Sequence, residues 1–289
     1  MGRNISHSRA SFATLWRHEW RLNGRGVWGI IALQYALSVL HVLLGLIPEI
    51  ENSVGTAIIN TAHVAAVIVQ LVSVVIVAVL VLLSYYRSMH GQYAHFTVST
   101  PVVAGKHLAV KVLWAWLALA VSILGAVLGT AMGTIEVQAR SMSASAVPEL
   151  ASLSAIADVL REAPLGVGLG VVIGAIVLLQ YVCEGVFIVT TAYSERFSRL
   201  GRAGGIIVAV VLGWLIRNVM VILAFFAVPL QVLFTGARSL ISDVEISAFP
   251  WGTLSFENAI PFGWLIGELL VIGIYWWITR HELTRHWSL

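Results

Sequence analysis

The chain has 289 residues, of which 59% are hydrophobic and only 11% are charged, and its formal net charge is +3. Its mean hydropathy is +0.91, whereas ordinary soluble proteins contain about 45–50% apolar and about 25% charged residues. The composition excludes a water-soluble protein and predicts one that is integral to a membrane.

The apolar residues gather in blocks long enough to cross a hydrocarbon core about 30 Å thick, which takes about 20 helical residues. We therefore predict an all-α integral membrane protein with six transmembrane helices, at 27–47, 64–85, 108–132, 165–193, 205–229 and 261–279. The connections between them are shorter than the ~50 residues of a small soluble domain. The whole chain, 1–289, is thus expected to form a single transmembrane domain.

The distribution of basic residues predicts the orientation. Most of the 17 Lys and Arg residues lie before the first span, after the last span, or in the second and fourth connections, whereas acidic residues concentrate in the other connections. Cytoplasmic loops retain positive charge. Both termini and the connection 87–107 are therefore predicted to be cytoplasmic, and 134–164 and 235–260 to be outer loops.

The cytoplasmic segment 1–26 contains an amphipathic stretch at 8–23. One stripe of that stretch carries its apolar side chains, Phe12, Leu15, Trp16 and Trp20. Such a helix can lie in the membrane interface, although a basic anchor that only fixes the topology is an equal alternative. On the outer side, an apolar stripe at 148–163 predicts a second interfacial helix, or equally a lid packed against the bundle.

Two rows of glycine repeat every four residues in the third and fourth predicted spans. The rows are Gly125, Gly129 and Gly133, and Gly166, Gly170 and Gly174. In lipid, small residues at this spacing let two helix backbones approach closely. Because both rows lie toward the outer leaflet, we expect them to face each other or a partner subunit. The alternative is that glycine is simply common in membrane helices.

Three ionisable residues, Glu184, Arg217 and Glu268, lie inside predicted spans, where charge is expensive and is usually turned inward. Arg217 and Glu268 fall at similar depth near the midplane, so an ion pair between them is expected. The three residues either line a polar path or carry coupling ions, or they only clamp the helices together. The structural role is preferred, because three isolated charges do not form a relay.

The sequence contains no recognisable catalytic or cofactor motif. Gly105 and Lys106 lack the upstream glycine of a phosphate-binding loop. His281 and His286 are five residues apart, not the four of a zinc-protease helix, and do not share a face. The single cysteine, Cys183, allows no intrachain disulfide. We therefore predict no enzyme, no catalytic residue, no metal or cofactor in this chain, and no nucleic-acid partner.

The connection 87–107 carries the most specific motif. Pro101 breaks the chain between an aromatic-rich stretch and the next helix. The residues of the motif are Tyr86, Arg87, Ser88, Tyr93, Pro101 and Lys111. In these residues and in its six-span topology, the sequence resembles the permease subunits of the type-2 ABC exporters of bacteria. It departs from their pattern at Gln92, where an acidic residue is common, and at Thr100, where leucine is usual.

The resemblance implies a transport role without catalysis in this chain. The family's loop between the second and third spans is a coupling helix that seats in a separate ABC ATPase subunit, which binds ATP and Mg²⁺. Here that role would fall to Arg87, Ser88, Met89, His90, Gln92, Tyr93 and Phe96. Segment 1–26 looks like the family's connector helix, and 235–260 like its partly re-entrant outer segment. Two permease copies, identical or related, would surround a path in the lipid bilayer.

The expected function is ATP-driven export of a hydrophobic or amphipathic substrate, such as a drug, a peptide or a lipid, across the plasma membrane. Two other classes stay open. One is a non-transporting sensor or immunity protein that binds a peptide at its outer surface. The other is an ion-coupled secondary transporter, which is disfavoured because the intramembrane charges are few and matching broken helices are not seen.

Overall fold

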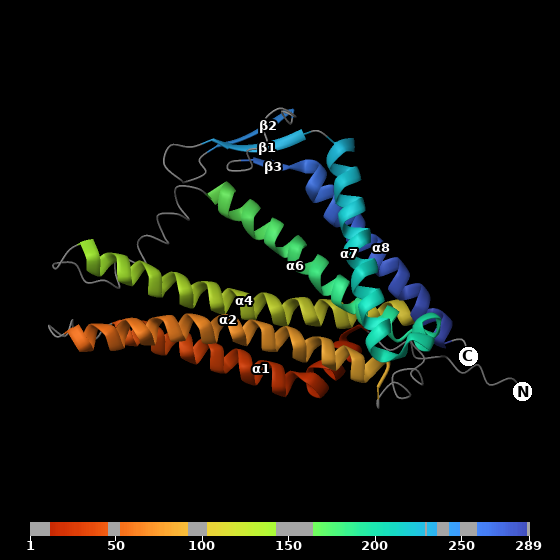
Figure 1. Ribbon diagram of the computed structural model, residues 1–289, viewed down its shortest axis with the longest axis horizontal. Helices are drawn as coiled ribbons and strands as arrows, with labels where there is room; N and C mark the ends of the chain where they lie inside the picture. Colours follow the sequence, from red (N-terminus) through yellow and green to blue (C-terminus); the bar gives the residue numbers. More distant parts are fainter. Residues whose placement is uncertain are drawn as a thin grey trace, which may run out of the picture.

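The computed structural model describes residues 12–45, 53–91, 103–142, 164–228, 230–235, 243–248 and 259–287. Its helices form two groups (Figure 1). The first group contains α1 (Phe12–Gly45), α2 (Ser53–Met89) and α4 (Ala104–Met142). The second contains α6 (Pro164–Ala192), α7 (Gly201–Ala227) and α8 (Phe262–Trp287), and the 3₁₀ helix η1 (Glu195–Leu200) leads into α7.

Within the described ranges, five helices are long and apolar enough to cross a membrane. Their apolar stretches are Val64–Met89, Ala104–Thr130, Val167–Ala192, Ala203–Ala227 and Phe262–Arg285. They confirm the prediction of an α-helical, multi-pass membrane protein. The predicted first span, 27–47, lies on α1 as far as Gly45 but is not among the five. The count of six spans, and the cytoplasmic location of the termini, stay predictions.

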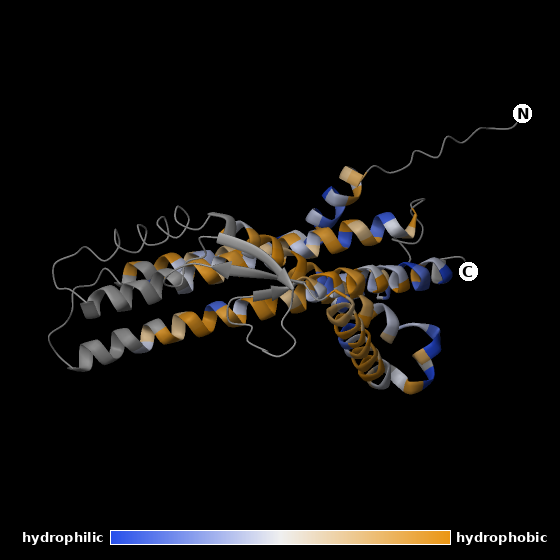
Figure 2. Cartoon of the chain, turned by 90° about the horizontal axis from the view of Figure 1, so that it is seen from above, coloured by the Kyte–Doolittle hydropathy of each residue, from blue (hydrophilic) through white to orange (hydrophobic). Residues whose placement is uncertain are grey.

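The outward-facing side chains of the bundle are apolar. Val75, Val171 and Trp214 keep 62%, 67% and 62% of their surface exposed. Soluble monomers rarely expose large contiguous apolar patches. The hydrocarbon core of a membrane, by contrast, favours apolar side chains on the protein surface. Figure 2 shows apolar residues along the middle of the helices and hydrophilic residues gathered toward one end.

The two helix groups meet at one end and diverge toward the other (Figure 1). At the meeting end, α2 and α6 end, α4 and α7 begin, and α8 ends. We call it the basic end because it carries several cationic side chains, Arg87, Lys106, Arg196, Arg199, Arg280 and Arg285. The opposite end is called the far end.

The core lies along the inner faces of the helices. Phe187 of α6 and Tyr275 of α8 are both fully buried and stack with ring centroids 4.8 Å apart. The hydroxyl of Tyr85 on α2 lies 2.7 Å from that of Thr190 on α6, which joins the two groups. Tyr85 follows Val77 and Val81 at four-residue spacing, so one face of α2 is buried.

Two of the long helices extend well beyond the predicted spans. α2 has 37 residues and α4 has 39, which correspond to about 55–58 Å at 1.5 Å per residue. Because α4 continues to Met142, the predicted outer loop 134–164 begins inside a helix. Hydropathy locates only the apolar part of a helix, and at the end of α4 the good helix formers Glu136, Gln138 and Arg140 continue the helix beyond that part.

A small sheet caps the far end of the second group (Figure 1). The chain was predicted to be all-α, and this sheet is the departure from that prediction. Its strands are β1 (Leu230–Thr235), β2 (Asp243–Ala248) and β3 (Ala259–Pro261), in the antiparallel order β2-β1-β3. β2 falls within 235–260, where a partly re-entrant segment was expected. Apolar and polar residues alternate at Val244, Glu245 and Ile246, a pattern that favours a strand. The hydrogen bonds between the strands satisfy the backbone N–H and C=O groups of these segments beyond the helix ends.

Candidate functional site

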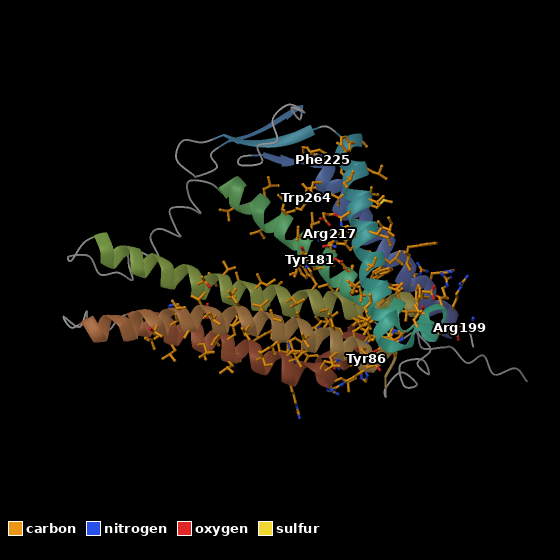
Figure 3. The ribbon with its side chains drawn as sticks, viewed as in Figure 1. Tyr86, Tyr181, Arg199, Arg217, Phe225 and Trp264 are labelled. Carbon is orange, nitrogen blue, oxygen red and sulfur yellow. The ribbon has the colours of Figure 1, made fainter. Side chains whose placement is uncertain are left out.

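The predicted ion pair between Arg217 and Glu268 is present between α7 and α8. Arg217 Nη2 donates a hydrogen bond to Glu268 Oε1 at 3.0 Å, and the Glu268 side chain is only 1% exposed. Arg217 Nη1 also donates to the Tyr181 hydroxyl at 3.4 Å, and the guanidinium lies 4.9 Å from the centre of the Tyr181 ring. Figure 3 shows Tyr181 and Arg217 side by side on α6 and α7. The salt bridge is therefore reinforced by a cation–π contact.

Glycines of α8 permit this close approach of α7 and α8. A Cβ atom at Gly267 would lie 2.8 Å from the Cα of Val221, and one at Gly263 would lie 2.6 Å from the Cα of Phe225. Any larger side chain would therefore separate the helices. Glu268 directly follows Gly267, so the same close contact brings its carboxylate within reach of Arg217.

Glu184 joins the same cluster from α6. Its Oε2 accepts a hydrogen bond from Gln180 Nε2 at 2.8 Å. Its Oε1 lies 3.7 Å from the position that a Cβ atom of Gly213 would occupy. The Tyr275 hydroxyl donates to the backbone carbonyl of Gly213 at 2.7 Å.

The structure thus brings all three predicted intramembrane charges together, and it adds residues that sequence reasoning missed. Glu184, Arg217 and Glu268 all lie within electrostatic reach of the Tyr275 hydroxyl. We define the charged cluster as Gln180, Tyr181, Glu184, Arg217, Glu268 and Tyr275. The available signal was spacing, because Gln180 and Glu184 are four residues apart and share a helix face.

A second polar cluster joins the three helices of the first group. Gln34 Nε2 donates to the Ser122 carbonyl at 2.9 Å, and the Ser122 hydroxyl donates back to Gln34 Oε1 at 2.8 Å. Gln70 Nε2 donates to Ser38 Oγ at 3.2 Å, and Gln70 Oε1 accepts from Thr130 at 3.1 Å. These five residues, which we call the polar seam, were not found from the sequence. Interhelical hydrogen bonds of this kind hold membrane helices together.

Where the structure describes their surroundings, the two glycine rows do not face each other, so that part of the prediction is wrong. A Cβ atom at Gly125 would lie 2.7 Å from the Tyr35 ring of α1, and one at Gly129 would collide with Gln70 and Ser38 of the polar seam. By contrast, Gly170 and Gly174 of α6 have nothing within 4 Å of a Cβ position. The far half of α4 packs on α1 and α2, whereas α6 diverges from it (Figure 1).

The expected contact of the α6 row with a partner subunit stays a prediction. The surroundings of Gly133 and Gly166 lie outside the described residues. A groove of about 270 Å³ opens beside Gly125 and Gly129, and it is walled almost entirely by apolar atoms. The groove is lined by Tyr35, Ser38, Val39, Leu43, Gly125, Leu128 and Gly129.

The residues expected to couple to an ATPase differ in their exposure. Arg87 is exposed at the end of α2, and His90, just after that helix, is half-buried. Ser88 and Met89 are 5% and 1% exposed and belong to the last turn of α2, so they cannot form a docking face as predicted. Three further members, Gln92, Tyr93 and Phe96, lie outside the described residues. Helical periodicity explains the difference, because it turns consecutive residues toward both the core and the solvent.

Aromatic and polar contacts tie the basic end together. The Tyr86 ring lies 4.6 Å and the His90 ring 5.8 Å from the ring of Tyr193, which follows α6. A Cβ atom at Gly105 in the first turn of α4 would lie 3.4 Å from Arg280 Nε of α8. Through these contacts, both ends of the connection between α2 and α4 are attached to the second helix group.

A buried ion pair fixes the start of α1 to α4. Lys111 pairs with Glu19, and their side chains are 5% and 9% exposed. Asn23 Nδ2 donates to the same carboxylate at 2.9 Å. The amphipathic stretch 8–23 is therefore not a separate element where the structure describes it, because α1 runs without interruption from Phe12 to Gly45.

The described residues contain no group of three His, Cys, Asp or Glu side chains that could hold a metal ion. Comparison of the chain with known protein families, with curated proteins and with solved structures finds no match. The class that the fold defines is thus an α-helical, multi-pass membrane protein.

Proposed function

We propose that the chain is the permease subunit of a type-2 ABC exporter in the plasma membrane. It would have six transmembrane helices, cytoplasmic termini and a second permease subunit as its partner. A separate ATPase subunit would bind ATP and Mg²⁺ and drive the export of a hydrophobic or amphipathic substrate. The basic end would be the cytoplasmic end, as its positive charge favours.

The observation that carries this proposal is the junction at the basic end. At the end of α2, where the connection to α4 begins, the rings of Tyr86 and His90 lie against the ring of Tyr193. At the start of α4, where the connection ends, Gly105 contacts Arg280 of α8. A partner that moved this connection would therefore push on α2, α4, α6 and α8 together.

The divergence of the two groups supports the same function. A small rotation at the junction produces a larger displacement at the far end, where the helix groups are separate (Figure 1). The polar seam holds α1, α2 and α4 as one body, and the charged cluster holds α6, α7 and α8 as another. Two bodies that pivot about one junction suit rigid-body alternating access.

Co-purification with a candidate ABC ATPase tests the proposal. We expect a type-2 ABC ATPase co-expressed with the wild-type chain to be retained on it in detergent. Reversal of two exposed charges at the ends of the connection, Arg87→Glu with Lys106→Glu, should abolish that retention. The matched control reverses Arg25 and Arg199, two exposed arginines on α1 and η1, and should retain the ATPase.

Two results would reject the exporter. The first is a folded wild-type chain that retains no ATPase with any co-expressed candidate. The second is equal loss of the ATPase in both double variants, which would show non-specific charge attraction. Circular dichroism and size-exclusion profiles of each variant establish that the chain is folded.

An ion-coupled secondary transporter is the second candidate, and the charged cluster favours it, because intramembrane acidic residues often mark ion pathways. The two candidates differ in their energy source. Substrate movement in vesicles that contain only this chain and a pH gradient would support the secondary transporter. Movement only with an ATPase and ATP would support the exporter.

A further inference from the structure

The first turns of α1 carry three exposed arginines, which we call the arginine face. They are Arg17, Arg21 and Arg25, and they follow one another at four-residue spacing, about 6 Å apart along the helix axis. Residues two apart on a helix point to nearly opposite sides. Arg17 and Arg21 each lie two residues from the buried Glu19, and Arg25 lies two residues from the buried Val27. The arginine face is therefore turned away from the core.

The contact of Glu19 with α4 fixes this orientation. Glu19 pairs with Lys111, which lies two turns from the start of α4. The start of α1 is thus held at the basic end, and the buried ion pair sets the rotation of the helix there. The three arginines are presented by a fixed helix and not by a loop.

The positive charge of the arginine face is not balanced within the protein as far as the structure describes it. Glu19 is the one acidic residue of α1, and its carboxylate already pairs with Lys111 and accepts from Asn23. No ion pair links the arginine face to a carboxylate of the described residues. Guanidinium groups bind phosphate through paired, charge-assisted hydrogen bonds. The arginine face is therefore available to an anionic partner.

Two tryptophans beside the arginine face indicate its depth in the membrane. Trp20 is exposed, and its ring centroid lies 5.0 Å from that of Trp28. The two rings meet over Gly24, where a Cβ atom would lie 3.4 Å from Trp28 Cδ1. Indole rings are enriched at the boundary between headgroups and hydrocarbon, because they combine an apolar body with a polar N–H. This position sets the arginine face at the level of the lipid phosphates.

The helix surface beside and beyond the arginine face is apolar and open. Leu22 and Leu33 are exposed, and a Cβ atom at Gly26 or Gly29 would meet nothing within 4 Å. A soluble anion would cover the arginines and leave this apolar surface bare. A phospholipid covers both, because its phosphate can contact the guanidinium groups while its acyl chains lie on the apolar surface.

We propose that the arginine face binds the headgroup of an anionic phospholipid in the membrane leaflet at the basic end. Clusters of Lys and Arg next to a membrane-spanning segment gain affinity for anionic lipids. A zwitterionic lipid is a weaker partner, because its ammonium group is repelled by the same arginines. This inference requires only that the protein is integral to a membrane, so it does not depend on the exporter function.

Native mass spectrometry of the full-length protein, stripped of lipid in a neutral detergent, tests the proposal. The probes are phosphatidylglycerol and phosphatidylcholine with identical acyl chains. We expect the wild-type protein to bind phosphatidylglycerol more tightly. The combined substitution Arg17→Gln, Arg21→Gln and Arg25→Gln should lower that affinity about 100-fold, since each arginine near a membrane surface contributes about fivefold.

A matched variant separates the arginine face from a general effect of positive charge. Arg87→Gln, Lys106→Gln and Arg199→Gln together remove three exposed charges elsewhere at the basic end, and they should leave the affinity for phosphatidylglycerol unchanged. The single change Arg21→Gln should lower it about fivefold. This single variant keeps the test decisive if the triple variant of the arginine face does not fold.

Three results would overturn the inference. Wild-type affinity for phosphatidylglycerol in the triple variant of the arginine face would mean that these arginines only fix the topology. Equal losses in both triple variants would mean non-specific attraction between charges. Displacement of phosphatidylglycerol by inorganic phosphate would mean that the arginine face binds a soluble anion and not a lipid.

Discussion

Replacing Gly129 by alanine should break the polar seam. A methyl group at this position would collide with Gln70 Nε2 and Ser38 Oγ, the two atoms of the hydrogen bond that joins α2 to α1. Moving Gln70 also strains its bond from Thr130. Interhelical hydrogen bonds in membrane proteins contribute about 0.6 kcal/mol each on average, and overpacking a close contact costs about 1–3 kcal/mol.

Alanine partly offsets this loss, because it is about 1 kcal/mol more favourable than glycine inside a helix. The net effect of Gly129→Ala should be a loss of about 2 kcal/mol in the free energy of unfolding. Unfolding in mixed micelles of increasing SDS content, followed by circular dichroism, measures this quantity. The matched control is Gly170→Ala, since a Cβ atom there would meet nothing within 4 Å.

Gly170→Ala should leave the stability of the isolated chain unchanged or raise it by up to about 1 kcal/mol. If Gly129→Ala is as stable as the wild-type protein, the close packing of Gly129 against the polar seam is refuted. Equal destabilisation by both substitutions would show that the α6 row is packed against another subunit in the purified protein.

Two further changes test other contacts by the same titration. Lys111→Met leaves the Glu19 carboxylate buried without its cation, which should lower the free energy of unfolding by about 3–5 kcal/mol. The control is Arg196→Gln, at a side chain that is 61% exposed, and it should cost less than about 1 kcal/mol. Similar losses for the two variants would contradict the burial of Glu19. Tyr275→Phe keeps the stacking on Phe187 but removes the hydrogen bond to the Gly213 carbonyl. It should therefore lower the free energy of unfolding by about 0.6–1.7 kcal/mol. An unchanged free energy of unfolding would show that this hydrogen bond contributes nothing to stability.

Some features of the far end were not readable from the sequence. Residues 230–235 and 243–248 become strands because they pair with each other and with 259–261, and pairing between distant segments leaves only a weak local signal. Likewise, the glycine rows gave the correct spacing but not the partner. Four-residue spacing identifies a face on a helix, whereas the neighbour of that face depends on the rotation and crossing of whole helices.

The sequence by itself determined the class of protein and the positions of the apolar stretches, because membrane insertion depends on local hydropathy. It also indicated the Arg217–Glu268 pair, because so few charges lie in the spans that their partners are nearly fixed. Only the tertiary structure decided that Tyr181 of α6 contacts Arg217 of α7 and that Gln34 and Gln70 form the polar seam. Neutral side chains have many possible partners, and the helix packing selects among them.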